Sequence, residues 1–277
     1  MFITSQQPLV ILLSEVKRLE TLWHNLASTL PGATKIKGAL VVHYPEIPIY
    51  IANHATSINV KEDEATNLIK RVTQYFSSRG FPYACFRISP LTRPKSFSSL
   101  LKKQGFEKKI DQSVMILREK QLEEKLSSEV KVKSIPRSEM DLYSKLLLSI
   151  FEMPADWKRS WNRLFLQWMQ RGMKFYVAYV DKKPVGTSGL LSIEKTGGIF
   201  NVGTLREYRR RGIGTTLTVH ALLDSISQGN SLHTLQTEAG SDAERLYKNI
   251  GFVTDHVVSF FAKEFKQKRR LVIESKA

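Results

Sequence analysis

Apolar residues between positions 213 and 226 recur every three or four residues, which is the period of a helix that buries one face. The residues of this face are Ile213, Leu217, Val219, Leu222 and Ile226. The pattern ends near Gly229 and Asn230, residue types that are common just after a helix. A strand-like run at 198–205 precedes it. The sequence therefore predicts a strand, a short turn and a helix in that order.

Hydrophobic patterning predicts further elements in both halves of the chain. In the first half we expect strands at 39–43 and 47–52, a fourth-strand candidate over 50–57, a helix at 64–78 and a strand at 83–88. In the second half we expect a strand at 130–135, a helix at 138–151 capped by Ser138, a helix at 156–171, a hairpin of strands at 174–181 and 184–193, and a strand at 235–238.

The chain contains an internal repeat. Residues 100–106 align with residues 246–252 at a shift of 252 − 106 = 146 positions, and four of the seven aligned residues are identical. An apolar strand-like run follows each copy, at 113–117 and at 257–261. The charged stretch 118–129 between the copies has few large apolar residues and is interpreted as a linker. We therefore expect two related domains, 1–127 and 128–277.

A basic turn rich in glycine joins the predicted strand at 198–205 to the helix that begins near Ile213. Three arginines, Arg209 to Arg211, supply permanent positive charge. Gly212 and Gly214 have no Cβ, so the backbone N–H groups at the helix start can come close to a phosphate. The chain has neither a G-x-x-x-x-G-K-[ST] nor a G-x-G-x-x-G motif. The turn thus predicts a phosphorylated cofactor held in another way.

Residues 201–217 together with 244–252 resemble the GNAT superfamily of acyl-CoA-dependent acyltransferases. Arg209, Gly212 and Gly214 match its [Q/R]-x-x-G-x-[G/A] pyrophosphate loop, and the segment around Tyr247 matches its late helix. The resemblance covers roughly residues 128 to 265. It implies an α/β fold of two GNAT-like domains in tandem, each with a central mixed, mostly antiparallel sheet flanked by helices.

The resemblance implies an N-acetyltransferase that moves an acetyl group from acetyl-CoA to a primary amine of a small molecule or a protein by direct attack. Tyr247 matches the family's general acid, and a phenol with a reference pKa near 10 suits proton delivery to a thiolate. No metal is implied. The residues expected to hold the acyl-CoA are Val202, Thr204, Arg209, Arg210, Arg211, Gly212, Ile213, Gly214, Thr215 and Ser241.

The general base is not evident in the sequence. Asn201 and Gly203 occupy the places near which many relatives carry a glutamate, and neither can accept a proton from an amine. Glu238 is a candidate base, although it is equally interpreted as an ordinary exposed carboxylate. Gly240 stands where relatives carry a cofactor-binding asparagine, and Ser241 beside it is the substitute. A non-catalytic CoA-binding regulator or a basic adaptor protein is therefore the alternative function.

The first domain lacks the cofactor loop. Residues 58–64 contain no glycine, and Glu62, Asp63 and Glu64 occupy the predicted helix start, where an anion would have to bind. Leu101 stands in the place of the second copy's tyrosine. We therefore expect a degenerate, catalytically silent copy that shapes the substrate cleft, docks with its twin or binds a partner.

The formal net charge of +16 suggests polyanionic partners, and the phosphates of CoA account for part of it. No nucleic-acid-binding module accompanies the charge, so a nucleic-acid partner is disfavoured. No apolar run is long enough to cross a bilayer, and the single cysteine, Cys85, lies in an apolar strand-like run. These features favour the cytoplasm and a buried Cys85. The helices that the resemblance expects to meet the acceptor carry aromatic residues that can cage an ammonium group but at helical spacing are more often core: Phe151, Trp157, Trp161, Phe165 and Trp168.

Overall fold

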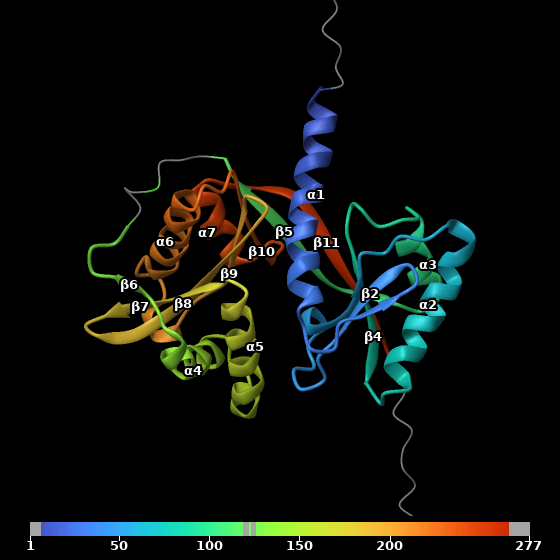
Figure 1. Ribbon diagram of the computed structural model, residues 1–277, viewed down its shortest axis with the longest axis horizontal. Helices are drawn as coiled ribbons and strands as arrows, with labels where there is room; N and C mark the ends of the chain where they lie inside the picture. Colours follow the sequence, from blue (N-terminus) through green and yellow to red (C-terminus); the bar gives the residue numbers. More distant parts are fainter. Residues whose placement is uncertain (1–6, 119–121, 123–125, 266–277) are drawn as a thin grey trace, which may run out of the picture.

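A single mixed sheet of eleven strands runs through the computed structural model, which describes residues 7–118, 122 and 126–265 (Figure 1). The strand order is β1-β2-β3-β4-β11-β5-β10-β9-β8-β7-β6. The first half contains α1 (Gln7–Ser28), β1 (Thr34–Ile36), β2 (Ala39–His43), η1 (Tyr50–Ala52), β3 (Asn53–Thr56), α2 (Glu62–Ser77), β4 (Tyr83–Ile88), α3 (Phe97–Lys103) and β5 (Glu107–Leu117).

The second half begins with a strand and two helices and then follows the predicted order. Its elements are β6 (Lys131–Ser134), η3 (Arg137–Glu139), α4 (Met140–Ile150), η4 (Ala155–Trp157), α5 (Lys158–Gln170), β7 (Lys174–Val180), β8 (Lys183–Ile193), β9 (Thr196–Thr204), η5 (Arg206–Tyr208), α6 (Ile213–Ser227), β10 (Leu232–Glu238), α7 (Asp242–Ile250) and β11 (Phe252–Glu264). Half of the predicted linker, 118–129, lies outside the described residues, which leave out 119–121 and 123–125.

The two halves exchange their last strands. Strand β5 of the first half lies between β10 and β11, and β11 of the second half lies between β4 and β5 (Figure 1). In the β5–β11 pairing, Glu107 faces Ala262 and Ile116 faces Val253. The repeat shift of 146 converts one pair into the other, since 107 + 146 = 253 and 262 − 146 = 116. The halves are thus related by an approximate two-fold axis that passes between β5 and β11.

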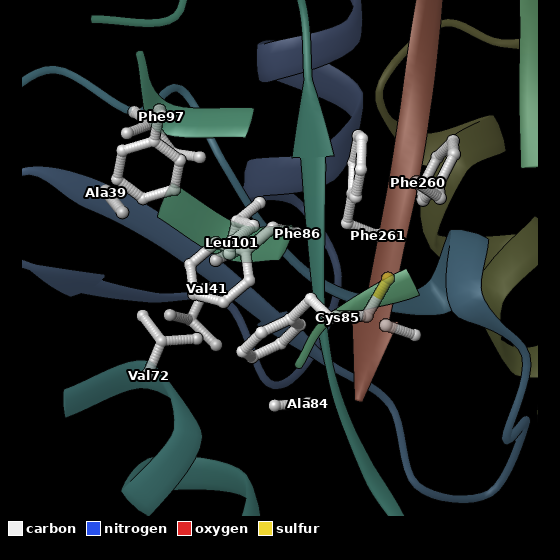
Figure 2. Packing of buried hydrophobic residues seen from close by; sticks show 14 of the residues in the cluster. Ala39, Val41, Val72, Ala84, Cys85, Phe86, Phe97, Leu101, Phe260 and Phe261 are labelled. Atoms are coloured by element: carbon white, nitrogen blue, oxygen red, sulfur yellow. The ribbon is translucent and has the colours of Figure 1, made fainter. Parts of the chain in front are cut away.

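Strand exchange also mixes the hydrophobic cores. Phe260 and Phe261 of β11 belong to the cluster of the first half, together with Phe86 on β4 (Figure 2). Cys85 lies in the same cluster and is fully buried, as the sequence predicts. Burial raises the pKa of its thiol, so Cys85 is a packing residue.

Helix α1 lies between the two halves in Figure 1 and was not predicted from the sequence. Val16, Leu19, Leu22 and Leu26 are buried at helical spacing along it. Leu19 packs into the core cluster of the first half, whereas Leu22 and Leu26 pack into the cluster around α4 and α5. Helix α1 therefore joins the two halves through apolar contacts with both.

The predicted strand at 47–52 is wrong. The side chain of Asn53 accepts the N–H of Tyr44 at 2.8 Å and donates to the carbonyl oxygens of Ile47 at 2.7 Å and Ile49 at 3.0 Å. The chain consequently curls round this buried amide and enters η1, so that only Asn53–Thr56 of the fourth-strand candidate pairs in the sheet.

The predicted cap of the first helix in the second half is also wrong. Ser138 lies inside the 3-10 turn η3, and α4 begins at Met140 without a side-chain cap. The predicted hairpin is present as β7 and β8, and Asp181 and Lys182 in its turn both have positive φ. The fold class predicted from the sequence, a mixed sheet flanked by helices in each of two halves, is confirmed.

Candidate active site

Strand β9 carries a bulge at the predicted cofactor edge. Its residues Asn201 and Val202 together face the single residue Ser188 of β8, because the pairing steps from Gly189 with Phe200 to Thr187 with Gly203. Asn201 has a φ of 54°, and Thr187 donates its hydroxyl to the Asn201 carbonyl oxygen at 2.8 Å. The bulge bends the strand and redirects its outer half.

Strands β9 and β10 separate just before this bulge. Their parallel pairing ends at Ile199 with Leu235, although β9 continues to Thr204 and β10 to Glu238. The β10-facing backbone of β9 beyond Ile199 therefore has no ladder partner among the described strands. Val202 and Thr204 lie on this half-buried stretch. An extended chain with amide groups can hydrogen-bond there as an added strand does.

The predicted phosphate loop lies at the end of β9. Gly212 has a φ of 74° and caps the N-terminus of α6, which begins at Ile213 with no side-chain cap. A Cβ on Gly212 would meet no atom closer than the Ser127 Cβ at 3.9 Å, so the constraint is on the backbone angle. Gly214 lies in the first turn, where a Cβ would be 3.3 Å from Leu246 Cδ1. Within the described part of the chain, no side chain accepts a hydrogen bond from the backbone N–H groups from Gly212 to Thr215.

The three loop arginines differ in their contacts. Arg209 donates to the carbonyl oxygens of Thr204 at 3.2 Å and Ile150 at 3.4 Å, so it ties the end of α4 to the end of β9. Arg210 is exposed and has a φ of 63°, and Arg211 forms an ion pair with Glu129 at 3.6 Å. Two arginines therefore carry exposed charge beside the start of α6.

Tyr247 lies on α7 and is 6% exposed. Its ring packs at 6.0 Å from the ring of Phe252, and its hydroxyl has no hydrogen bond within the described part of the chain. Burial raises the pKa of Tyr247, so the phenol is protonated at neutral pH. A protonated phenol is the form that can donate a proton.

Ser241, predicted to bind the cofactor, caps α7. Its hydroxyl accepts the Glu244 N–H at 3.2 Å and donates to the Glu238 carbonyl oxygen at 2.6 Å. Sequence reasoning missed Glu244, although Ser241 and Glu244 have the spacing of a capping box. The Glu244 carboxylate accepts the Gly240 N–H at 2.6 Å and the Thr254 hydroxyl at 3.1 Å. These contacts fix the turn that precedes Tyr247.

The structure gives a physical reason for the glycine at 203, one of the two positions near which a glutamate base was expected. A Cβ on Gly203 would lie 2.3 Å from Ile150 Cγ2 of α4, so no side chain fits there. Asn201 is half-buried, and its amide nitrogen has no hydrogen-bond partner among the described residues. Glu238 is exposed at the end of β10. Strand β9 itself therefore supplies no carboxylate near the β9–β10 opening.

The corresponding opening in the first half is closed. Asn59 and Arg93 form a parallel bridge beyond β3 and β4. Arg93 donates its N–H to the Ile58 carbonyl oxygen at 3.0 Å and accepts the Val60 N–H at 3.3 Å. Helix α2 begins with three acidic residues, and Leu101 is fully buried. The first half thus has backbone hydrogen bonds where the second half has two separated strands.

Residues 142–252 match the profile of the acetyltransferase (GNAT) family. This part of the chain is therefore a GNAT domain, and acyl transfer is the general activity that such a domain supports. A comparison with curated proteins gives no match.

Solved structures match the fold of both halves. A GCN5-related N-acetyltransferase from Kribbella flavida has a TM-score of 0.67 at 13% identity, over 91% of this chain and 96% of that chain. A tandem GNAT protein from the clavulanic acid biosynthesis pathway has a TM-score of 0.60 at 13% identity, over 76% and 74%. A GCN5-related N-acetyltransferase from Sphaerobacter thermophilus has 0.60 at 19%, over 72% and 67%. These likenesses confirm the predicted tandem GNAT fold.

Among the residues that the structure describes, no helix is long and apolar enough to cross a membrane. The same residues contain no group of three or more metal-ligating side chains.

Proposed function

We propose that the second half transfers an acetyl group from acetyl-CoA to a primary amine by direct attack. The observation that carries this proposal is the opening between β9 and β10, which ends at a helix N-terminus with positive-φ Gly212 and no capping side chain. The opening accepts an extended amide chain, and the helix start accepts its phosphates. We retain 1–127 and 128–277 as the two domains, with only the second as the catalytic one.

Most of the predicted site residues have a role in this proposal, whereas Arg209 and Ser241 bind backbone groups of the protein itself. The N–H groups from Gly212 to Thr215 bind the pyrophosphate, with charge from Arg210 and Arg211. The backbone groups of Val202 and Thr204 hold the pantetheine arm, and one of their N–H groups stabilises the developing oxyanion. Tyr247 donates its proton to the departing thiolate. When acetyl-CoA is bound, its thioester supplies the activated acyl group.

The absence of a carboxylate on β9 bears on how the amine is deprotonated. Because Gly203 packs directly against Ile150, a base must come from Glu238 or from water, or the amine must arrive neutral. The lack of a carboxylate on β9 also favours the second candidate function, a regulator that binds CoA and does not catalyse acyl transfer.

Calorimetric titration with acetyl-CoA tests the proposal, followed by thiol release with an amine panel. The matched variants are Gly212→Asp and Gly212→Asn, which have the same shape and both tolerate a positive φ. They differ by one charge, which at about 5 Å from a phosphate and an effective dielectric constant near 40 is worth about 1.7 kcal/mol, or about 15-fold in Kd. Binding without thiol release would favour the regulator, and equal binding by the two variants would contradict the loop assignment.

A further inference from the structure

A polar pocket of about 350 Å³ lies in the first half, between α1 and the loops that follow β3 and β4. A cavity of roughly 150 Å³ holds benzene, so this pocket has room for a molecule of several polar groups. Its lining comes from one face of α1, at 17, 20, 21 and 24, and from the loops, at 57–59, 89 and 91–93. The predicted site residues do not include this pocket.

The pocket lies at the place in the first half that corresponds to the β9–β10 opening in the second. Strand β3 pairs in parallel with β4 at Ala55, and the parallel pairing of β9 with β10 ends at Ile199. The second residue beyond each of these pairs has a positive φ, which is 52° at Ser57 and 54° at Asn201. A positive φ is strained for serine, and such strain occurs chiefly where a functional geometry is held in place. The first half therefore keeps the backbone conformation of this position although it lacks the cofactor loop.

The way in for an acyl-CoA is closed, so the ligand of this pocket is a smaller molecule. Asn59 and Arg93 line the pocket and also form the bridge that joins the chain beyond β3 to the chain beyond β4. This bridge uses backbone groups that an added extended chain would need. The three acidic residues at the start of α2 disfavour a pyrophosphate there, but they do not line the pocket.

Positive charge exceeds negative charge in the pocket. Lys17 and Arg93 line it, and neither forms an ion pair within the described part of the chain. Glu20 is the only carboxylate among the described residues that line it. That carboxylate already pairs with Arg87 at 2.7 Å and contacts His256 at 3.3 Å. The pocket therefore attracts a ligand that carries negative charge.

The guanidinium of Arg93 is fixed and has one edge without a partner. Its Nη1 donates to the carbonyl oxygens of Pro90 at 3.0 Å and Thr92 at 2.9 Å. Its Nε and Nη2 have no acceptor among the described residues, and the side chain is exposed, so a ligand can reach this edge. Two parallel N–H groups on one edge match the two oxygens of a carboxylate or a phosphate. Because the protein already holds the guanidinium, little further ordering is needed when an anion binds.

Hydroxyl groups in the pocket supply further donors. Thr92 is 6% exposed, and its hydroxyl oxygen accepts the Ser89 N–H at 3.0 Å. The Ser89 hydroxyl oxygen accepts the Leu91 N–H at 3.3 Å. Neither hydroxyl hydrogen has an acceptor among the described residues. A ligand that brings oxygen atoms can accept these hydrogens.

We propose that this pocket binds a small hydroxylated organic anion, whose carboxylate or phosphate group pairs with Arg93 and Lys17 and whose other oxygens meet Ser89 and Thr92. The pocket is separate from the β9–β10 opening, so this proposal stands or falls independently of the proposed acetyl transfer. It gives the first half a binding role of its own.

Three probes with the same three-carbon skeleton test the proposal: D-glycerate, glycerol 3-phosphate and uncharged glycerol. Calorimetric titration at constant ionic strength should show that at least one of the two anions binds at one site per chain and that glycerol does not. The anion that binds more tightly identifies the charged group as a carboxylate or a phosphate. A Kd weaker than about 10 mM for both anions would overturn the proposal.

Three variants, each of which removes one positive charge, locate the bound anion. Arg93→Gln should weaken its binding by at least about tenfold, because it removes a charged fork. Lys17→Gln should weaken binding by a smaller factor, because the lysine is a flexible point charge. Arg210→Gln is the matched control at the start of α6 and should leave the affinity unchanged. Far-UV circular dichroism shows whether each variant is folded, and Lys17→Gln tests the pocket if Arg93→Gln does not fold.

The pattern across the variants decides between locations. Weaker binding in Arg93→Gln and Lys17→Gln, with unchanged binding in Arg210→Gln, supports the pocket. Equal weakening in all three would show that the net charge alone governs binding, and weakening in Arg210→Gln alone would place the anion at the start of α6. Either of these results, or unchanged affinity in both pocket variants, would overturn the proposal.

Discussion

Removing the carboxylate of Glu20 should strongly destabilise the protein, because this residue holds α1 against the sheet. The side chains of Glu20 and Arg87 are 10% and 5% exposed, and their two hydrogen bonds form a fork at 2.7 and 2.9 Å. His256 contacts the same carboxylate at 3.3 Å. Breaking one partner of a buried pair leaves an unpaired charge and costs about 3–5 kcal/mol. We expect a loss of this size in the free energy of unfolding for Glu20→Leu.

The double variant Glu20→Leu/Arg87→Leu separates the cost of a stranded charge from the value of the pair. Because no unpaired guanidinium remains, the double variant should lose less stability than Glu20→Leu alone. Urea unfolding near pH 7, followed by far-UV circular dichroism, measures the native protein, the single variants Glu20→Leu and Arg87→Leu, and the double variant. A loss below about 1 kcal/mol for Glu20→Leu, or a double variant that loses the sum of both single losses, would refute this reasoning.

The pH dependence gives a second measurement on the same pair. Burial alone would raise the pKa of Glu20, but the Arg87 charge and the hydrogen bonds from His256 and Arg87 hold it far below its usual value of 4.5. A carboxylate with a lowered pKa contributes stability above its unfolded pKa and loses it as the pH falls toward the folded pKa. The stability difference between the native protein and Glu20→Gln should therefore shrink steadily as the pH is lowered below about 4.5.

Two further changes test the candidate site. Tyr247→Phe should lower kcat by about a hundredfold or more, which is the usual contribution of a general acid. The acetyl-CoA Kd measured by calorimetry should stay within about twofold. Unchanged turnover would show that Tyr247 is not the general acid. Glu244→Gln should cost about 1.5–3 kcal/mol near pH 7, since the Gly240 N–H and other hydrogen bonds lower the pKa of Glu244 to about 2. That stability is present above pH 4.5 and lost toward pH 2, so thermal unfolding curves of the two proteins should converge in acid.

The sequence predicts local structure best where a single short-range rule decides it. The turn at Asp181 and Lys182 and the glycine loop at Gly212 both follow from the backbone angles that these positions need. The segment 47–52 has the apolar pattern of a strand, but the amide of Asn53 binds three backbone groups and redirects it. The pattern of apolar residues does not reveal that a single amide will be buried and hydrogen-bonded in this way, so the turn could not be predicted from it.

Other features were encoded but need spatial information to interpret. Leu19, Leu22 and Leu26 have helical spacing, yet only the structure shows that they join two different cores. Ser241 and Glu244 have the spacing of a capping box, yet the carboxylate binds Gly240 and two strands besides its own helix. The repeat reveals that the halves are alike, but it does not show that they exchange β5 and β11.

Strand exchange explains why a half without a cofactor loop remains necessary to the site of the other half. Strand β5 of the first half pairs with β10 from Gln112 to Ile116, so it supports the strand that forms one side of the opening. Helix α1 of the first half contributes Trp23, whose ring contacts the ring of Phe200 on β9 at 5.0 Å. In turn, β11 fills the core of the first half with Phe260 and Phe261. The first half can therefore lose its own opening, closed by the Asn59–Arg93 bridge, and still support the strand beside the opening of the second half.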